Sequence, residues 1–133
     1  MALVGALIVR DGMLLLGLRS SNKASYPDMW DVIGGHVDAG ETFEHALLRE
    51  LDEEAGIRPL VYSEHSRHPL PQDGVLVLFR ITRWAGGEPR LRNDEHVELR
   101  WFWIEEACTL TNLAAPEYVP IFRSFDISSG ARP

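Results

Sequence analysis

Two hydrophobic runs at the start of the chain are typical of paired strands. Residues 3–9 and 13–19 are rich in leucine, valine and isoleucine, and Asp11-Gly12 separates them. An Asp-Gly pair between two apolar runs is a strong hairpin signal, because both residues tolerate the positive φ angles of a tight turn. The sequence therefore predicts a β-hairpin at its start.

A helix is the next long element that the pattern predicts. Residues 20–28 are polar and indicate a loop, and the glycine pair at 34–35 breaks the short apolar stretch that follows. From residue 42 to residue 55 the apolar positions recur with the spacing of an amphipathic helix. Gly56 comes next, and a glycine just past the last helical residue is a common helix stop.

The second half of the chain predicts more strands than helices. The expected strands cover residues 60–67, 75–85 and 97–104, and the expected helical segments cover residues 105–110 and 116–125. Strands on both sides of one central helix favour a mixed sheet with helices packed against it, an α/β or α+β domain. The length fits one domain over residues 1–127, with residues 128–133 as a flexible tail.

The net charge of the chain argues against some classes of binding partner. The formal net charge is −7 and the pI is near 5.1. An acidic surface argues against non-specific binding to nucleic acid or to anionic lipid, so neither partner is expected. A phosphorylated small molecule stays compatible with this charge, because a bound divalent cation can invert the local field.

Other residues that often carry chemistry give no competing site. Cys108 has no second cysteine to pair with, and its neighbours indicate a small buried side chain. His65 and His68 lie close together, but no second ligand-rich segment supports a zinc site. The apolar run 2–9 is too short to span a bilayer and lacks the flanks of a secretion signal. We therefore expect a reducing, cytoplasmic location.

Three glutamates gather on one flank of the expected helix. At about 100° per residue, Glu50, Glu53 and Glu54 fall within an arc of roughly 100°. Solvated glutamates are common on helices, and that is the alternative interpretation. Against it, Glu50 and Glu54 repel each other at i,i+4 spacing, in the last turn, where the helix dipole disfavours anions. A hard cation such as Mg²⁺ or Mn²⁺ would relieve both effects.

These glutamates belong to a longer pattern that resembles the Nudix box. The matched positions are Gly35, Glu41, Arg49, Glu50, Leu51, Glu53, Glu54, Gly56 and Ile57, and together they satisfy every specified position of the box. Trp30, the glycine pair and the stretch 101–104 also resemble the family. Ile33 departs from it, since many members have proline there, but the departure removes no catalytic group. The chain is thus identified as similar to MutT-like Nudix hydrolases.

The resemblance implies both a fold and a reaction. The fold would be an α/β/α sandwich with a central mixed sheet and the catalytic helix packed at its edge. The reaction would be hydrolysis of a diphosphate bond with Mg²⁺, or Mn²⁺, as the cofactor. The expected partner is then a small-molecule nucleotide diphosphate, and the protein would be a monomer or a homodimer.

The resemblance also implies which residues bind the metal. Glu53 and Glu54 would be the principal ligands, with Glu50 as a further ligand or as the base that activates water. The backbone carbonyl of Gly34 would be another ligand. Some members take a further glutamate from a distant loop, for which Glu95 is favoured over Glu98 because it precedes the expected strand. A solvated loop acid is the alternative at that position.

The remaining box residues would support the site. Arg49 would pair with a carboxylate of the cluster and hold it in orientation. Glu41 would anchor the loop at the helix entrance, and Gly35 belongs to the turn before it. Gly56 would let the chain leave the helix sharply.

The substrate is less defined than the reaction, because the box recognises only the diphosphate. Possible base-stacking groups are Tyr26, Trp30, Phe79, Trp101 and Trp103, with core packing as the alternative for each. Asn112 is only a weak counterpart of the base-reading asparagine of some relatives. The short chain favours a nucleoside triphosphate, including deoxy forms, hydrolysed as by MutT. The alternatives are ADP-ribose or a nucleotide sugar as substrate, or a non-catalytic Nudix binding module.

Overall fold

Strand β1 (Ala2–Arg10) is the strand on which both sheets of the protein are built. In the computed structural model, which describes residues 1–129, β1 pairs in parallel with β6 (Gly74–Ala85) and antiparallel with β4 (Ile33–His36). Strand β5 (Arg58–Leu70) continues this sheet on the outer side of β6. The sheet is therefore mixed, as the sequence predicts.

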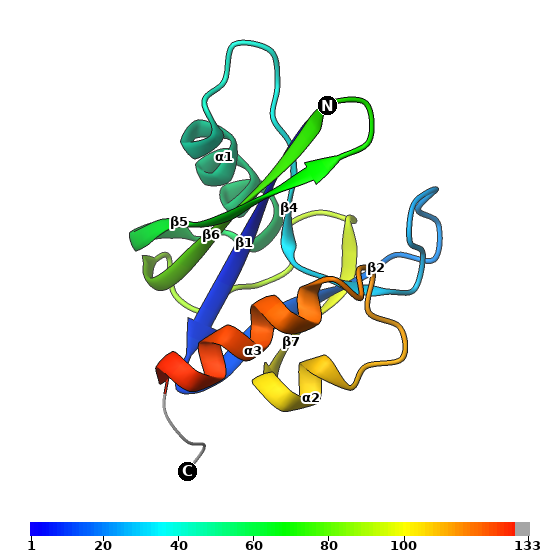
Figure 1. The fold of residues 1–133 in the computed structure, drawn as a ribbon. Coiled ribbons are helices and arrows are strands. Elements are labelled where there is room, and N and C mark those ends of the chain that lie inside the picture. The colour runs from blue at the N-terminus through cyan, green and yellow to red at the C-terminus, as the bar shows by residue number, and fades with distance from the viewer. Residues whose placement is uncertain (130–133) are drawn as a thin grey trace.

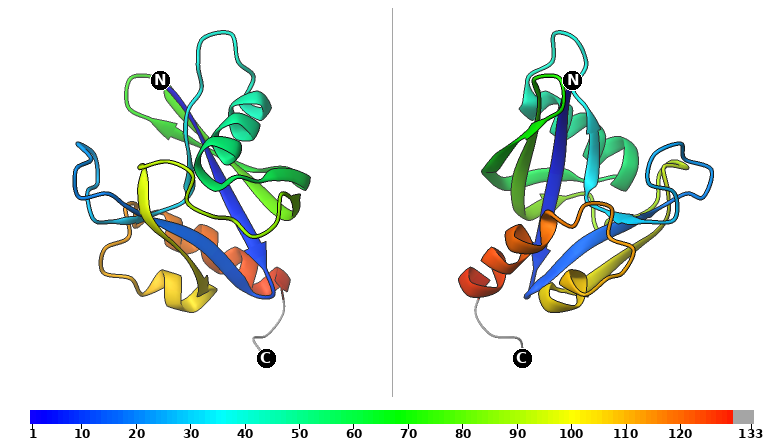
Figure 2. Two further views of the ribbon diagram at one scale, coloured as in Figure 1. Left: turned by 180° about the vertical axis from the view of Figure 1, so that it is seen from behind. Right: turned by 45° about the vertical axis from the view of Figure 1, so that its right-hand side comes forward.

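The remaining strands form a second sheet around β2 (Met13–Arg19). Strands β7 (His96–Trp103) and β3 (Trp30–Asp31) both pair antiparallel with β2, while only the last two residues of β1 pair with it. The predicted hairpin is confirmed: Asp11 and Gly12 have φ angles of 53° and 78°. Figure 2 shows β2 and β7 leaving β1 at an angle, so that the two sheets splay apart.

Helices cover the sheets from opposite sides (Figure 1). Helix α1 (Phe43–Ala55) lies on one side, and α2 (Ile104–Cys108) and α3 (Tyr118–Ser129) lie on the other. Successive side chains of a strand point to opposite faces. On β1, Ala6 and Ile8 belong to the core layer under α1, whereas Leu7 and Val9 belong to the layer under α3. The expected α/β/α sandwich is confirmed, and β1 is without polar side chains up to Val9 because both of its faces are buried.

Both ends of α1 are capped by specific contacts. The N-cap Thr42 accepts a hydrogen bond from the backbone N–H of His45 at 3.1 Å, and Gly56 ends the helix with a φ of 66°. Arg90 closes the same end: its backbone N–H donates to Ala55, and its guanidinium donates to the carbonyl of Gly56 at 3.4 Å. A cation at this position also suits the negative end of the helix dipole.

Several elements extend beyond their predicted bounds. Strand β5 is longer than residues 60–67 because it pairs with β6 over nearly its whole length. Its Pro59 and Pro69 are tolerated because β5 is an edge strand. Strand β7 begins at His96, one residue earlier than expected. Helix α3 continues to Ser129, two residues into the expected tail, and residues 130–133 of that tail lie outside the described residues. Within residues 1–129, no helix has the length and apolar character needed to cross a bilayer.

Replacing Gly56 by alanine is expected to destabilise the protein more than replacing Gly87, although both have positive φ angles. Each alanine costs about 1–2 kcal/mol in a left-handed backbone. At Gly56 the new Cβ would also lie 2.8 Å from the Arg90 guanidinium carbon, whereas nothing lies within 4 Å of a Cβ at Gly87. Urea unfolding of the two variants measures the difference. Equal losses would mean that the Arg90 contact adds nothing to the helix end.

Candidate functional site

Arg49 connects helix α1 to the turn that precedes it. Its guanidinium donates two hydrogen bonds of 2.8 Å to the carboxylate of Glu41, one of 2.9 Å to Glu50, and one of 2.8 Å to the carbonyl of His36. These hydrogen bonds from Arg49 lower the pKa of Glu41 to about 2. The orientation of Glu50 is therefore set by a planar group with fixed donor directions.

The glycine pair lies close to its neighbours, Gly35 to Glu50 of this network and Gly34 to the backbone of β1, so that a side chain at either position would force a shift. A Cβ on Gly35 would lie 2.5 Å from Oε1 of Glu50, and a Cβ on Gly34 would lie 2.0 Å from the carbonyl oxygen of Val4. Real Cβ atoms essentially never approach other atoms this closely. Both glycines are thus required by the contact of β4 with α1 and β1.

Glu53 and Glu54, the two expected principal metal ligands, differ in their exposure to solvent. The Glu53 side chain is 51% exposed and lies 3.4 Å from the Arg49 guanidinium. Glu54 is only 2% exposed, and neither of its carboxylate oxygens accepts a hydrogen bond from a described residue. Burial, with Glu50 beside it, raises the pKa of Glu54 well above its ordinary value. The buried His96 faces it, with Nδ1 3.5 Å from Oε1, and burial lowers the pKa of His96 to about 4.

The carboxylates of Glu50, Glu53 and Glu54 are the kind of ligand that a divalent cation prefers, although they do not form a complete ligand set. Among residues 1–129, no three acidic, histidine or cysteine side chains are arranged to hold a metal ion. Glu54 nevertheless presents two buried oxygens without a donor, next to Glu50. Mg²⁺ commonly uses one or two protein carboxylates and completes its shell with water and phosphate oxygens. Glu50 and Glu54 fit that requirement, and the exposed Glu53, which has only a 3.4 Å contact to Arg49, would supply a third carboxylate.

A cavity of about 210 Å³ opens beside the glycine pair. Gly34, Gly35, His96 and Glu95 line it on the side of the glutamates. On the other side it shares Tyr26, Asp31, Leu76 and Tyr118 with an adjoining hollow of about 370 Å³ under α3. The two spaces together lead away from the carboxylates along one face of the sheet.

Asp31 and Tyr118 form a polar contact where the two spaces meet. The Tyr118 hydroxyl donates to Oδ1 of Asp31 at 2.8 Å, and the backbone N–H of Val32 donates to the same oxygen at 2.8 Å. Burial raises the pKa of Asp31, and these two hydrogen bonds oppose the rise. The sequence interpretation missed both residues. The available signal was a single carboxylate inside the apolar stretch between Trp30 and Ile33.

Glu95 lies at the edge of the cavity and is held by cations. It forms an ion pair with Lys23, and Arg19 lies 3.9 Å from its carboxylate. Burial alone would raise the pKa of Glu95, but Lys23 and Arg19 outweigh it and the pKa is lowered. Glu98, the alternative loop acid, pairs instead with Arg100 at 2.7 Å.

Most of the aromatic residues expected to stack on a base do not line the cavity beside the glycine pair. Trp30 is 6% exposed and packs edge-on against Phe102, so it belongs to the core. Trp101 stacks on Trp84, with the Arg10 guanidinium 4.3 Å from its ring centre. Trp103 packs over the hairpin turn at Gly12. Tyr26 is the member of the set that lines the cavity, and it is 55% exposed.

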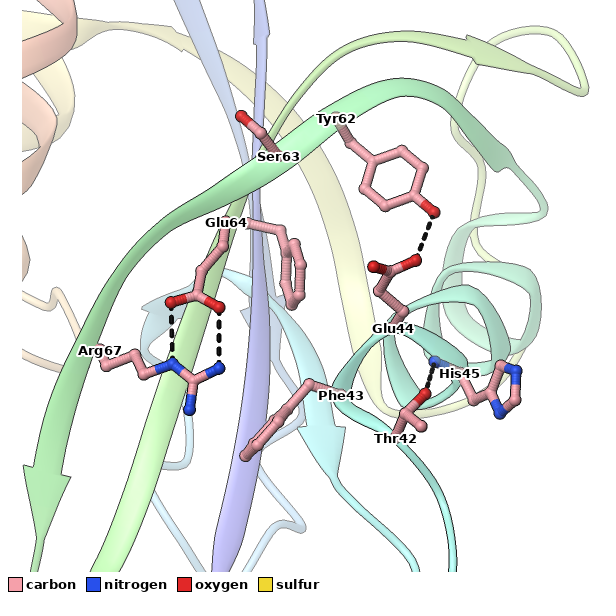
Figure 3. Close-up of a pocket in the computed structure, with 9 residues that line it drawn as sticks. Thr42, Phe43, Glu44, His45, Tyr62, Ser63, Glu64 and Arg67 are labelled. Carbon is pink, nitrogen blue, oxygen red and sulfur yellow. Dashed lines mark hydrogen bonds and ion pairs between the residues drawn. The ribbon is translucent and has the colours of Figure 1, made fainter.

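The last two candidates from the sequence also make structural contacts. The amide of Asn112 donates to the carbonyl of Asp28 at 3.0 Å, and its backbone carbonyl accepts from Trp30, so Asn112 fastens a loop. Phe79 is buried at the base of a third hollow, of about 490 Å³, between α1 and β5. Figure 3 shows that the polar groups there already pair with each other, as Tyr62 with Glu44 and Arg67 with Glu64. None of the box glutamates Glu50, Glu53 and Glu54 lines this hollow or the cavity beside the glycine pair, but Gly35 and His96 of that cavity contact Glu50 and Glu54.

Comparison with known proteins connects this geometry to a family. A family model described as NUDIX domain matches residues 1–125. The CTP pyrophosphohydrolase of Escherichia coli (strain K12) is 32% identical over 130 residues, which are 98% of this chain and 94% of that protein. The nucleoside triphosphatase NudI of Escherichia coli (strain K12 / DH10B) is 35% identical over 111 residues, covering 74% of this chain and 79% of that protein. The crystal structure of a MutT NUDIX hydrolase from Burkholderia pseudomallei is similar with a TM-score of 0.78 at 28% identity, covering 92% of this chain and 95% of that chain.

The contact of Arg49 with Glu41 predicts a specific acid sensitivity of the fold. Because the folded pKa of Glu41 is about 2, below its ordinary 4.5, ionised Glu41 stabilises the folded state. This stabilisation is fully present above about pH 4.5 and is lost as the pH falls towards 2. Glu41→Gln should therefore lose less stability than the wild type over this range. Urea unfolding at several pH values tests it, with the exposed Glu117→Gln as a control that keeps the wild-type slope.

Proposed function

Because the chain belongs to the Nudix hydrolases, which act on pyrophosphate bonds of nucleotide derivatives, we propose that it is a Mg²⁺-dependent pyrophosphohydrolase of nucleoside triphosphates. The observation that carries the proposal is the environment of Glu54. Its carboxylate is buried beside Glu50 without a hydrogen-bond donor among residues 1–129. An unpaired buried carboxylate is costly in the apo protein, and a cation that it binds removes that cost.

The bond that breaks is a phosphoanhydride between two phosphorus atoms of the substrate. Water attacks one of the two phosphorus atoms, the bond from that phosphorus to the bridging oxygen breaks, and the bridging oxygen stays with the other phosphorus; the products are a nucleoside monophosphate and pyrophosphate. A bound divalent cation supplies charge neutralisation of the diphosphate and lowers the pKa of water. Glu50 and Glu95 are the candidates for accepting the proton of the attacking water.

The protein residues around Glu50 contribute orientation. Arg49 holds the Glu50 carboxylate, and Glu41 and the His36 carbonyl hold Arg49 from the other side. A carboxylate that is fixed before the substrate binds does not have to be reoriented during the reaction. Glu95 would need to exchange its ion pair with Lys23 before it accepts a proton.

The adjoining cavities support a nucleotide as the substrate. They extend from the glycine pair past Tyr26 to the contact between Asp31 and Tyr118. An exposed tyrosine offers a stacking face for a base, and a carboxylate offers an acceptor for an exocyclic amino group. This arrangement suits a base such as cytosine, in agreement with the similarity to a CTP pyrophosphohydrolase over 98% of the chain. ADP-ribose and nucleotide sugars are the alternative substrates to be compared with it.

Glu54→Gln is expected to abolish turnover while leaving the apo protein as stable as the wild type, or more stable. Loss of a ligand to the cation removes several kcal/mol of charge stabilisation, or on the order of 100-fold or more in rate. The glutamine keeps the size of the side chain and removes the ionisable acid that burial disfavours, so the apo fold loses nothing. The assay is Mg²⁺-dependent release of pyrophosphate or phosphate from the four nucleoside triphosphates, ADP-ribose and a nucleotide sugar. Thermal unfolding in EDTA is measured alongside. Activity of this variant, and of Glu53→Gln, equal to that of the wild type would contradict the proposal.

Tyr26→Ala should raise KM for the preferred nucleotide by about tenfold, with little change in kcat or stability. Stacking of a base on an aromatic ring is worth about 1–3 kcal/mol, and Tyr26 is exposed at the cavity. Trp101→Ala is the matched control, since Trp101 packs against Trp84 and Arg10 away from the cavity. It should lower the free energy of unfolding and leave KM unchanged. Steady-state kinetics and urea unfolding of both variants separate the two effects, and an equal rise of KM in both would count against a base site at Tyr26.

A further inference from the structure

His96 and Glu54 form a buried polar pair inside the protein, with Glu50 next to the Glu54 carboxylate. The two side chains are 3% and 2% exposed, and Nδ1 of His96 lies 3.5 Å from Oε1 of Glu54. Neither ring nitrogen of His96 and neither carboxylate oxygen of Glu54 has a hydrogen-bond partner among the described residues. Buried polar atoms are nearly always hydrogen-bonded, so four such atoms on two adjacent side chains require an explanation.

The fold directs His96 towards Glu54 by means of a β-bulge. Opposite β2, Leu18 pairs with Glu98 and Arg19 pairs with His96, so β7 carries Val97 as an extra residue. One extra residue moves the preceding side chain to the other face of the sheet. His96 therefore points to the side of α1, while Glu98 remains on the opposite face, where Arg100 lies against Trp30. Without the bulge, the imidazole would face away from the glutamates.

Strand β2 provides a place for the imidazole at Gly17. A Cβ on Gly17 would lie 2.6 Å from Cδ2 and 2.8 Å from Cγ of the His96 ring. Gly17 lies on the same face of β2 as Leu15, which packs in the core layer under α1. The ring is thus held between a backbone that lacks a side chain and the carboxylate of Glu54.

We propose that His96 is the positioning residue for Glu54: its ring N–H holds the Glu54 carboxylate in the orientation that binds the divalent cation. This inference rests on the proposed function. Groups that hydrogen-bond to metal ligands fix the ligand's direction and raise its affinity for the metal. In the apo protein the pair is separated by 3.5 Å, slightly beyond a normal hydrogen bond. An ionised, cation-bound Glu54 would attract the N–H and close that distance.

The test is Mn²⁺ affinity, measured by electron paramagnetic resonance of the free ion, together with thermal unfolding in EDTA. His96→Leu should weaken Mn²⁺ binding by about 10- to 100-fold, the usual effect of losing a partner that orients a ligand. Its melting temperature in EDTA should equal or exceed that of the wild type, because two unpaired buried nitrogens are removed. His96→Gln, whose amide retains a donor, should recover most of the affinity.

Two further variants separate positioning from simple packing. Phe102→Leu changes a buried residue of the same strand that faces the other core layer. It should lower the melting temperature in EDTA and leave the Mn²⁺ affinity unchanged. Gly17→Ala displaces the imidazole without removing it, and it should weaken Mn²⁺ binding in the same direction as His96→Leu. If His96→Leu does not fold, the Mn²⁺ affinity of Gly17→Ala tests the inference in its place.

The possible outcomes are distinct. Mn²⁺ affinity within about twofold of the wild type in both His96→Leu and Gly17→Ala would overturn the inference. So would a loss of apo stability like that of Phe102→Leu without rescue of affinity by His96→Gln, since that result describes a packing residue. If wild-type protein binds Mn²⁺ no more tightly than Glu54→Gln does, the metal site of the proposed function itself fails. That failure is recognisable before any His96 variant is measured.

Discussion

The guanidinium of Arg49 is the contact on which the geometry of the candidate site depends. It binds Glu41 with two hydrogen bonds, Glu50 with a third and the His36 carbonyl with a fourth. These groups come from α1, from its entrance and from the end of β4, so one side chain fixes three segments relative to each other. The planar arrangement of its donors makes this possible, and a lysine at the same position could not reproduce it. Gly35 is the counterpart of this contact, because any side chain there would collide with Glu50.

The second constraint is the burial of the Glu54 carboxylate without a hydrogen-bond donor, which makes the site suited to a cation. Glu41 and Glu50 are both paired with Arg49, whereas Glu54 lies deeper and has no such partner. A fold that served stability alone would place an apolar residue or a paired acid at this position. Glu53 and Glu54 differ in exposure because they point in different directions from α1. Both glutamates lie in the last turn of α1, but Glu53 faces solvent and Glu54 faces the interior.

The sheet separates the cavity beside the glycine pair from the larger hollow of Figure 3. Phe79 and Leu76 lie on opposite faces of β6, so the first lines the hollow under α1 and the second lines the hollow under α3, from which the cavity beside the glycine pair extends to His96. The cavity beside the glycine pair is lined by the buried and unpaired His96, whereas in the larger hollow Arg67 pairs with Glu64 and the Tyr62 hydroxyl donates a hydrogen bond to Glu44. The volume of a hollow is therefore a weaker guide to the site than the state of the groups that line it.

The sequence by itself determined the features that arise from short-range interactions. The hairpin at Asp11-Gly12, helix α1 with its stop at Gly56, and the spacing of the box follow from turn preferences and helical periodicity, which act within a few residues. Only the tertiary structure decided which aromatic residues are core and which line the cavity, because Trp30 is buried by packing on Phe102, which is distant along the chain. It also decided that Asp31 meets Tyr118 and that His96 faces Glu54. Both contacts join segments that are distant along the chain, and the second depends on a single extra residue at Val97 that reverses the face on which a side chain lies.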